Sequence, residues 1–229
     1  MGKIGIIVAM TSEFNLVSVL LEEKHERHVN GFSFVEGRLD GKEVVLAKSG
    51  IGKVCAAVGV SEMIREYSPA CIVNTGVAGG IDASLQVMDI VVGGRTVYHD
   101  VWCGEGNAYG QIQGLPAFFE ADARLLKAAL SIGSDVRLLN GLICTGDQFI
   151  TDRVALNKIK DHFPEGFAVD MESCAMAQVC YLYRVPFLSF RIISDTPGRT
   201  DDHSLQYREF WTIAPEKSFE VLRQLIARV

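Results

Sequence analysis

The chain has 229 residues, of which 48% are hydrophobic and 22% are charged, and this composition excludes an intrinsically disordered protein. Its 22 basic and 28 acidic residues give a formal net charge of −6, which argues against a nucleic-acid-binding protein because such proteins need a basic surface. No stretch reaches the roughly 18 apolar residues of a membrane span, so we expect neither nucleic acid nor a membrane as a partner.

The chain begins with the apolar run 4–10, which no signal-peptide cleavage site follows, and we expect a buried strand there. Further short segments rich in Val and Ile alternate with helix-like segments. The expected strands cover 3–9, 32–39, 42–48, 71–75, 88–93, 138–144 and 186–193, and the expected helices cover 12–24, 51–66, 120–131, 151–161, 171–183 and 207–228.

This alternation predicts the α/β class, as a three-layer α/β/α sandwich in one domain over residues 1–229. Several strands are apolar on both faces, which indicates a sheet covered on both sides. The dipeptide Asp40-Gly41 separates two of the strands and is a strong hairpin signal, so we expect the central sheet to be mixed.

The cysteines indicate a reducing compartment. The six thiols include no C-x-x-C pair and mostly stand in apolar segments, which is typical of a cytoplasmic protein rather than a disulfide framework. The five histidines show no metal-ligand spacing, so we expect no metal site.

Residues suited to chemistry stand at the ends of four of the expected strands and after one further short apolar, strand-like stretch at 168–169, and ligands of α/β sheets bind at the carboxyl ends of strands. These residues are Glu13, the glycine-rich segment 74–80, Phe149, the pair Asp170 and Glu172, and Arg191 with Asp195.

Each feature also has a structural explanation when it is taken alone. The acids could interact with helix N-termini, the glycines could form a turn, Phe149 could belong to the core, and Arg191 could pair with Asp195. Together they predict a pocket for a neutral, flat, hydroxylated molecule. Acyl transfer has no support, since neither G-x-S-x-G nor a Ser/His/Asp order is present.

Seven short segments, spread in order over nearly the whole chain, carry a resemblance to a known family. They are IGIIVAMTSEF (4–14), KSGIGKV (48–54), NTGVAGG (74–80), YHD (98–100), TGDQFI (145–150), VDME (169–172) and RIISD (191–195). The sequence resembles the 5'-methylthioadenosine/S-adenosylhomocysteine nucleosidases of the nucleoside phosphorylase/hydrolase superfamily. The resemblance implies a nucleoside phosphorylase-like fold, a homodimer, an adenine nucleoside as substrate and no cofactor.

The same resemblance implies catalytic roles for two acids and ribose contacts for two neighbours. Glu13 matches the carboxylate that activates water, and Asp195 matches the acid that assists the leaving adenine at N7. Glu172 matches the carboxylate that binds the ribose hydroxyls, and Met171 the residue under the sugar. The reaction implied is hydrolysis of the N-ribosidic bond of 5'-methylthioadenosine and S-adenosylhomocysteine.

Further substrate contacts are implied for residues around the base. Phe149 matches the ring that stacks on adenine, and Ile150 supplies backbone bonds to it. Arg191 and Ser194 match residues near the water and the Asp195 loop, and Tyr207 matches an aromatic lid residue.

The sequence also departs from the family pattern. Val77 takes a substrate-site position where many relatives carry serine, so one hydroxyl near the water is missing, and Asp170 stands where glutamate is usual. The segments 101–108 and 196–206 are divergent. In relatives the first of these reaches into the partner's 5'-substituent pocket, so we expect Trp102 to be either a wall of that pocket or an interface anchor.

Three other functions remain as alternatives: a related purine nucleosidase such as an aminofutalosine-type enzyme, a nucleoside phosphorylase, and a non-catalytic nucleoside-binding module. A phosphorylase binds phosphate with several arginines, whereas only Arg191 is near and Glu13 would repel the anion. A binding module would not need Glu13, Glu172 and Asp195 together.

Overall fold

Ten strands form one mixed sheet in the computed structural model, which describes residues 2–197, 207, 210–211 and 215–229. The order in the sheet is β10-β6-β8-β9-β5-β1-β4-β3-β2, and β7 pairs with β6. The strands are β1 (Ile4–Val8), β2 (Glu22–Val29), β3 (Phe32–Leu39), β4 (Lys42–Lys48), β5 (Cys71–Gly80), β6 (Ile90–Tyr98), β7 (Phe119–Glu120), β8 (Leu138–Thr145), β9 (Gly166–Asp170) and β10 (Phe187–Asp195). The predicted hairpin is confirmed, since β3 and β4 pair antiparallel across residues 40–41.

One part of the sheet closes on itself, because β10 pairs with both β6 and β5. The strands β5, β9, β8, β6 and β10 therefore form a ring. Each ring strand contributes one apolar side chain to a buried cluster, namely Ala78, Val91, Ile143, Ala168 and Ile193. Closure brings the ends of β5, β9 and β10 together, and β1 lies directly beside β5.

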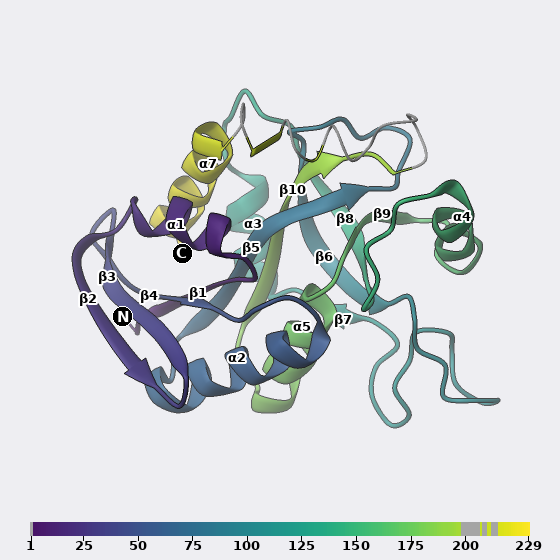
Figure 1. Ribbon diagram of the computed structural model, residues 1–229, viewed down its shortest axis with the longest axis horizontal. Helices are drawn as coiled ribbons and strands as arrows, with labels where there is room; N and C mark the ends of the chain where they lie inside the picture. The colour runs from purple at the N-terminus through teal and green to yellow at the C-terminus, as the bar shows by residue number, and fades with distance from the viewer. Residues whose placement is uncertain (1, 198–206, 208–209, 212–214) are drawn as a thin grey trace.

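Helices cover both faces of this sheet, as the sequence predicts (Figure 1). They are α1 (Thr11–Ser18), α2 (Lys53–Tyr67), α3 (Ala123–Leu130), α4 (Arg153–His162), α5 (Ser173–Tyr183) and α7 (Pro215–Arg228). On one face α2 and α5 share a buried cluster with Ile7, and on the other α1, α3 and α7 share a cluster with Ile6. Neighbouring residues of β1 thus face opposite helical layers, as expected for a strand covered on both sides.

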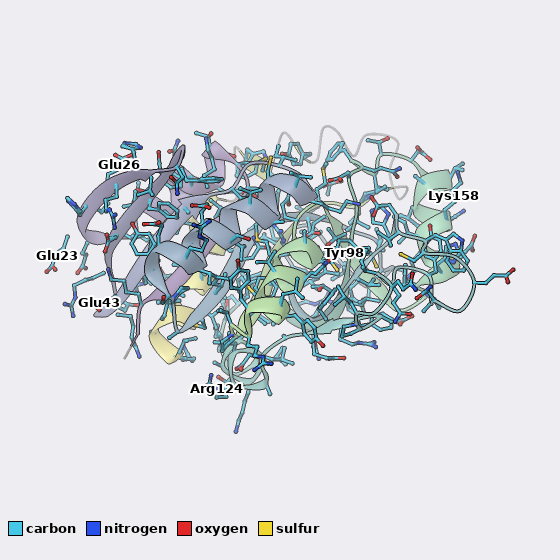
Figure 2. All side chains as sticks on the ribbon, turned by 90° about the horizontal axis from the view of Figure 1, so that it is seen from below. Glu23, Glu26, Glu43, Tyr98, Arg124 and Lys158 are labelled. Carbon is cyan, nitrogen blue, oxygen red and sulfur yellow. The ribbon has the colours of Figure 1, made fainter. Side chains whose placement is uncertain are left out.

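The predicted helix 12–24 is wrong beyond Ser18, where α1 ends. Residues 22–29 form β2, and all of them except the partly buried Val29 are exposed. β2 pairs with β3 at the outer edge of the sheet, and the exposure of its side chains on both sides shows that neither face is covered. Its sequence accordingly carries no apolar alternation. Figure 2 shows Glu23 and Glu26 projecting outward from this region.

A turn in the glycine-rich segment is also contradicted, because β5 continues as a strand through Gly80. A Cβ atom added to Gly79 would lie 3.1 Å from Pro197 and 3.2 Å from Val169, and one added to Gly80 would lie 3.0 Å from Ile193. The glycines therefore allow close packing inside a strand rather than ending it.

The remaining predicted elements are present with shifted ends, while β7 and β9 were not predicted. The predicted helix 207–228 is described as α7 from Pro215, and much of the range before it lies outside the described residues.

Within the described residues no helix is both long and apolar enough to cross a bilayer. All six cysteines have free thiols, and Cys71, Cys144, Cys174 and Cys180 are buried.

Candidate active site

A cavity of about 120 Å³ lies where the ends of β1, β5, β9 and β10 meet the segment after β8. Nine of the ten residues predicted for the site line it, and the tenth, Arg191, lies behind it in contact with Glu172. The nine are Glu13, Val77, Phe149, Ile150, Met171, Glu172, Ser194, Asp195 and Tyr207. The fold thus brings together residues that are up to 194 positions apart, between Glu13 and Tyr207 (207 − 13).

Glu13 lies in the first turn of α1 and is only 1% exposed. Its Oε2 accepts hydrogen bonds from the backbone N–H groups of Ala9 (3.0 Å) and Met10 (2.9 Å), just after β1. Its Oε1 accepts a third bond from Val77 N–H on β5, at 3.0 Å. The helix-terminus explanation is therefore correct for the local bonds, but the bond to β5 also fixes this carboxylate in the cavity.

Burial raises the pKa of the Glu13 carboxyl, although the Arg191 charge and the three backbone N–H groups act in the opposite direction. A carboxyl with a raised pKa accepts a proton more readily than an exposed one. Such a group is suited to general-base chemistry at neutral pH.

Gly76 on β5 makes room for the charged side chains of the site. A Cβ atom at this position would overlap Oε1 of Glu13 and would lie 2.7 Å from Nη1 of Arg191. Both groups therefore approach the strand backbone at a position that has no side chain.

Arg191 is fully buried on β10 and holds several polar groups at once. Its Nε lies 2.8 Å from Oδ2 of Asp170 and donates to Ser173 Oγ at 3.1 Å. Its Nη2 donates to Asn74 Oδ1 at 2.7 Å and to Glu172 Oε2 at 3.5 Å. Among the described residues, the Nη1 group has no hydrogen-bond partner. Leaving a buried donor unpaired costs roughly 1–3 kcal/mol, which marks a place for a water or a ligand.

Glu172 precedes α5 and faces the cavity. Its Oε1 accepts a hydrogen bond from the backbone N–H of Gly52, immediately before α2, at 2.9 Å. Burial, and the nearby charges of Asp170 and Glu13, raise the pKa of Glu172 to about 7, against the opposing effect of Arg191. This carboxyl consequently carries a partial charge near neutral pH.

The Gly52 donor is anchored by a charged cluster at the start of α2. Lys53 Nζ donates to both carboxylate oxygens of Asp100, at 2.9 and 2.8 Å, and the Lys53 backbone N–H donates to Asp147 Oδ1 at 2.8 Å. Three of the segments that carried the family resemblance, 48–54, 98–100 and 145–150, therefore meet at this cluster.

Asp195 ends β10 and is 2% exposed. The Ser194 hydroxyl donates to Asp195 Oδ1 at 2.7 Å and also lies 3.4 Å from the Ala78 carbonyl oxygen. Ser194 thus orients the carboxylate, and the backbone of β5 lies alongside.

Phe149 is 57% exposed, which rules out the alternative that it belongs to the core. Its ring packs edge-to-face against Tyr207, with ring centroids 5.8 Å apart at 70°. The Tyr207 hydroxyl contacts Met10 Sδ at 3.5 Å. An exposed aromatic ring at a cavity mouth is free to stack on a flat ligand. The predicted lid segment around Tyr207 lies largely outside the described residues.

Sequence reasoning missed residues that line or support the cavity. Met10, Ile51 and Gln148 line it, and Asn74 and Ser173 support Arg191 from behind. Asn74 and Ser173 stand inside quoted motifs or directly after them, but short polar side chains in apolar segments give no distinct signal. Among the described residues, no group of three or more His, Cys, Asp or Glu side chains is arranged to hold a metal ion.

Comparison with known proteins agrees with this geometry. A family model described as the phosphorylase superfamily matches residues 3–227, and the chain belongs to that superfamily. A 5'-methylthioadenosine/S-adenosylhomocysteine nucleosidase from Marinomonas sp. (strain MWYL1) is 39% identical over 230 residues, which are 99% of each protein.

Solved structures lead to the same family. The nucleosidase from Neisseria meningitidis, in complex with methylthio-immucillin-A, superimposes with a TM-score of 0.94 at 36% identity and full coverage of both chains. The enzyme from Colwellia psychrerythraea 34H, in complex with adenine, gives a TM-score of 0.92 at 36% identity over 99% of this chain and 95% of its own. Within the superfamily, the chain therefore belongs to the 5'-methylthioadenosine/S-adenosylhomocysteine nucleosidases, and the predictions of the family, the fold class and a hydrolase are confirmed.

Proposed function

We propose that this protein hydrolyses the N-ribosidic bond of 5'-methylthioadenosine and S-adenosylhomocysteine, releasing adenine and the 5-substituted ribose. One observation carries the proposal: two buried carboxylates, Glu13 and Asp195, line one cavity together with Glu172. Adenine nucleosides are supported as substrates by the relatives, which are named for these two compounds and solved with adenine or nucleoside analogues.

Glu13 activates the attacking water in this proposal. The unpaired Nη1 of Arg191 and Oε1 of Glu13 both lie close to Gly76. A water bound near both groups would donate to the carboxylate and accept from the guanidinium. As its oxygen bonds to the anomeric carbon, its proton passes to Glu13, whose raised pKa favours that transfer.

Glu172 binds the ribose hydroxyls, and Met171 packs under the sugar. Glu172 already accepts from Gly52 N–H and from Arg191, and its remaining acceptor capacity faces the cavity. Loss of the base leaves positive charge on the sugar in the transition state. The carboxylates of Glu172 and Glu13 stabilise that charge.

Asp195 supplies a proton to N7 of adenine, so that the bond between sugar and base breaks to give a neutral leaving group. The Ser194 hydroxyl holds this acid in place, and its 2% exposure limits exchange with solvent. Phe149 stacks on the purine, and Ile150 offers its backbone to the edge of the base. Tyr207 covers the stacked ring.

Water rather than phosphate is the nucleophile. Arg191 is the cation beside the carboxylates of the cavity, and its charge already faces Asp170, Glu172 and Glu13. A phosphate dianion there would be repelled by the surrounding carboxylates and would lack the several arginines that such an anion needs.

The test is to incubate the protein with methylthioadenosine in phosphate buffer and in a phosphate-free buffer. We expect equal rates of adenine release and free methylthioribose in both. A ribose 1-phosphate product would make the protein a phosphorylase. Binding of the nucleoside without release of adenine would make it a binding module.

We also propose a homodimer in the cytoplasm. The outer face of the start of α2 exposes Ile51, Val54 and Val58, and Trp102 is 58% exposed, so these apolar side chains are available for a subunit interface. Trp102 does not line the cavity of its own chain, which leaves it available to complete the partner's. The dimer is tested by light scattering of a Val54→Lys, Val58→Lys variant, which is expected to give the mass of a monomer. The role of Trp102 is tested by kinetics: Trp102→Ala is expected to change the ratio of kcat/KM between methylthioadenosine and S-adenosylhomocysteine.

A further inference from the structure

A buried polar cluster lies behind the cavity, and of its four members Asp170 also lines the cavity wall. It consists of Asn74 on β5, Asp170 at the end of β9, Ser173 at the start of α5, and Ser189 on β10. Asn74, Ser173 and Ser189 are 0% exposed. None of these four is assigned a catalytic role, yet three of them contact the Arg191 guanidinium.

The Asn74 side chain has its two ends fixed by different strands. Its Nδ2 donates to the carbonyl oxygen of Ile7 on β1 at 3.0 Å, so its Oδ1 must point the other way. That oxygen accepts from Arg191 Nη2 at 2.7 Å, which is the shortest neutral contact of the guanidinium. The bond to β1 therefore sets the orientation of the Asn74 amide, and the bond from Nη2 to Oδ1 sets the orientation of the Arg191 guanidinium.

The guanidinium is planar, so fixing two of its nitrogens fixes the third. Asp170 and Ser173 hold Nε, and Asn74 holds Nη2, which leaves Nη1 on the side of Gly76 and Glu13. The same strand pair also positions Glu13, through the N–H groups of Ala9, Met10 and Val77. β1 and β5 thus set both groups that would hold the attacking water.

We propose that Asn74 is a positioning residue for catalysis: it turns the Arg191 guanidinium so that Nη1 faces the water bound by Glu13. This inference rests on the proposed function, because it gives Nη1 a water to hold. Asn74 acts on the rate only through Arg191 and makes no contact with the nucleoside.

The experiment compares Asn74→Ala and Asn74→Thr with Ser189→Ala as the matched control. Threonine keeps most of the volume and suits a strand, so it protects the test against a variant that fails to fold. Ser189 belongs to the same buried cluster: its hydroxyl lies 2.6 Å from Ser173 Oγ and donates to Asn74 Oδ1 at 3.5 Å, but no bond of it to Arg191 is present. Its removal leaves the bonds of Asn74 to Ile7 and to Arg191 in place. We expect kcat for methylthioadenosine to fall ~10²-fold in both Asn74 variants, with KM changed less than ~3-fold, because misplacing a catalytic contact lowers the rate without emptying the pocket. Ser189→Ala is expected to keep kcat within ~3-fold of the wild type.

A double-mutant cycle tests whether Asn74 acts through the arginine. Arg191→Lys keeps the charge but loses the planar fork, so there is no guanidinium left to orient. We expect Asn74→Thr to lower kcat less than ~3-fold further in this background. The same ~10²-fold loss in both backgrounds would overturn the proposal, as would folded Asn74 variants with a normal kcat.

A second readout separates this inference from the proposed function. If the wild type releases no adenine from methylthioadenosine, the proposed function fails. Crystal structures of the wild type and Asn74→Thr then decide the positioning role alone. A guanidinium turned away from Gly76 in the variant supports it, and an unmoved guanidinium refutes it.

Discussion

The two halves of the cavity are built differently. The ribosyl half, which consists of Glu13, Glu172 and Arg191, is buried and bonded to strand backbone and to other buried side chains. The base half, which consists of Phe149, Ile150 and Asp195, combines a buried acid with a ring that is 57% exposed. If the proposed roles hold, the difference teaches that buried strand ends hold the groups that move protons and charge, Asp195 included, whereas an exposed ring in the segment after β8 recognises the flat base.

The largest effect is expected from Glu13→Gln in the ribosyl half. The glutamine keeps the shape but cannot take a proton from water, so kcat should fall ~10²–10⁴-fold. One of the three backbone N–H bonds loses its acceptor, while the cost of burying a charge disappears, so the melting temperature should change by no more than about 4 °C. Steady-state kinetics and thermal unfolding are measured on the same preparation. The exposed Glu43→Gln serves as control, and near-normal turnover in folded Glu13→Gln would remove Glu13 from the mechanism.

In the base half, the largest loss of activity is expected from Asp195→Asn. Asparagine can still donate a hydrogen bond to N7 but cannot transfer a proton, so we expect kcat to fall ~10²-fold or more. Affinity for adenine, measured by calorimetry, should change far less, because the cavity keeps its shape. The opposite pattern, a lower melting temperature with normal turnover, would show that Asp195 has a structural role only.

Phe149→Ala should separate recognition from stability. Stacking of a base on an aromatic ring contributes about 1–3 kcal/mol, so we expect KM for methylthioadenosine to rise ~10-fold with a smaller effect on kcat. The melting temperature should stay nearly constant because the ring is more than half exposed. Leu130→Ala on α3, another exposed apolar side chain, should leave both quantities unchanged. A large loss of stability in Phe149→Ala would contradict the distinction between the halves.

The smallest effect concerns pH and the ribosyl half. The pKa of Glu172 is raised from 4.5 to about 7, so between these values the folded chain holds a proton that the unfolded chain releases. The contribution of this group to stability is complete below the unfolded value and is lost as the pH rises through the folded one. Glu172→Gln stays neutral and keeps an acceptor for the Gly52 N–H, so it should become more stable relative to the wild type between about pH 5 and pH 8, by on the order of 1–3 kcal/mol. A stability difference that does not change with pH would contradict the raised pKa.

Prediction from sequence succeeded where local pattern and motif suffice. The hairpin at residues 40–41 and the strands apolar on both faces were readable from the sequence, and nine of the residues that line the cavity were readable through the family resemblance. The strand β2 was not, because an edge strand with neither face covered has a polar sequence that also suits a helix. Closure of the ring was not predicted either, since the pairing of β10 with β5 joins segments more than 100 residues apart.

The supporting residues of the site were invisible for a related reason. Glu13 and Glu172 stand out because buried acids are rare, but Asn74 and Ser173 gain their meaning only from Arg191, which is more than 100 positions from the first of them. The spacing of these residues in the sequence does not indicate that they contact Arg191. Gly52 was likewise hidden, because its contribution is a backbone N–H that every residue type except proline possesses.

Gly76 has a consequence for how this protein can change over generations. Every single-base change that replaces this glycine introduces at least one carbon atom where Glu13 and Arg191 already crowd the backbone. Gly133, by contrast, has open space around it and an ordinary backbone conformation, so many amino acids would be harmless there. Two glycines that look alike in the printed sequence therefore differ in evolutionary freedom: one position is closed to variation for as long as the acid and the arginine remain, and the other is open to drift.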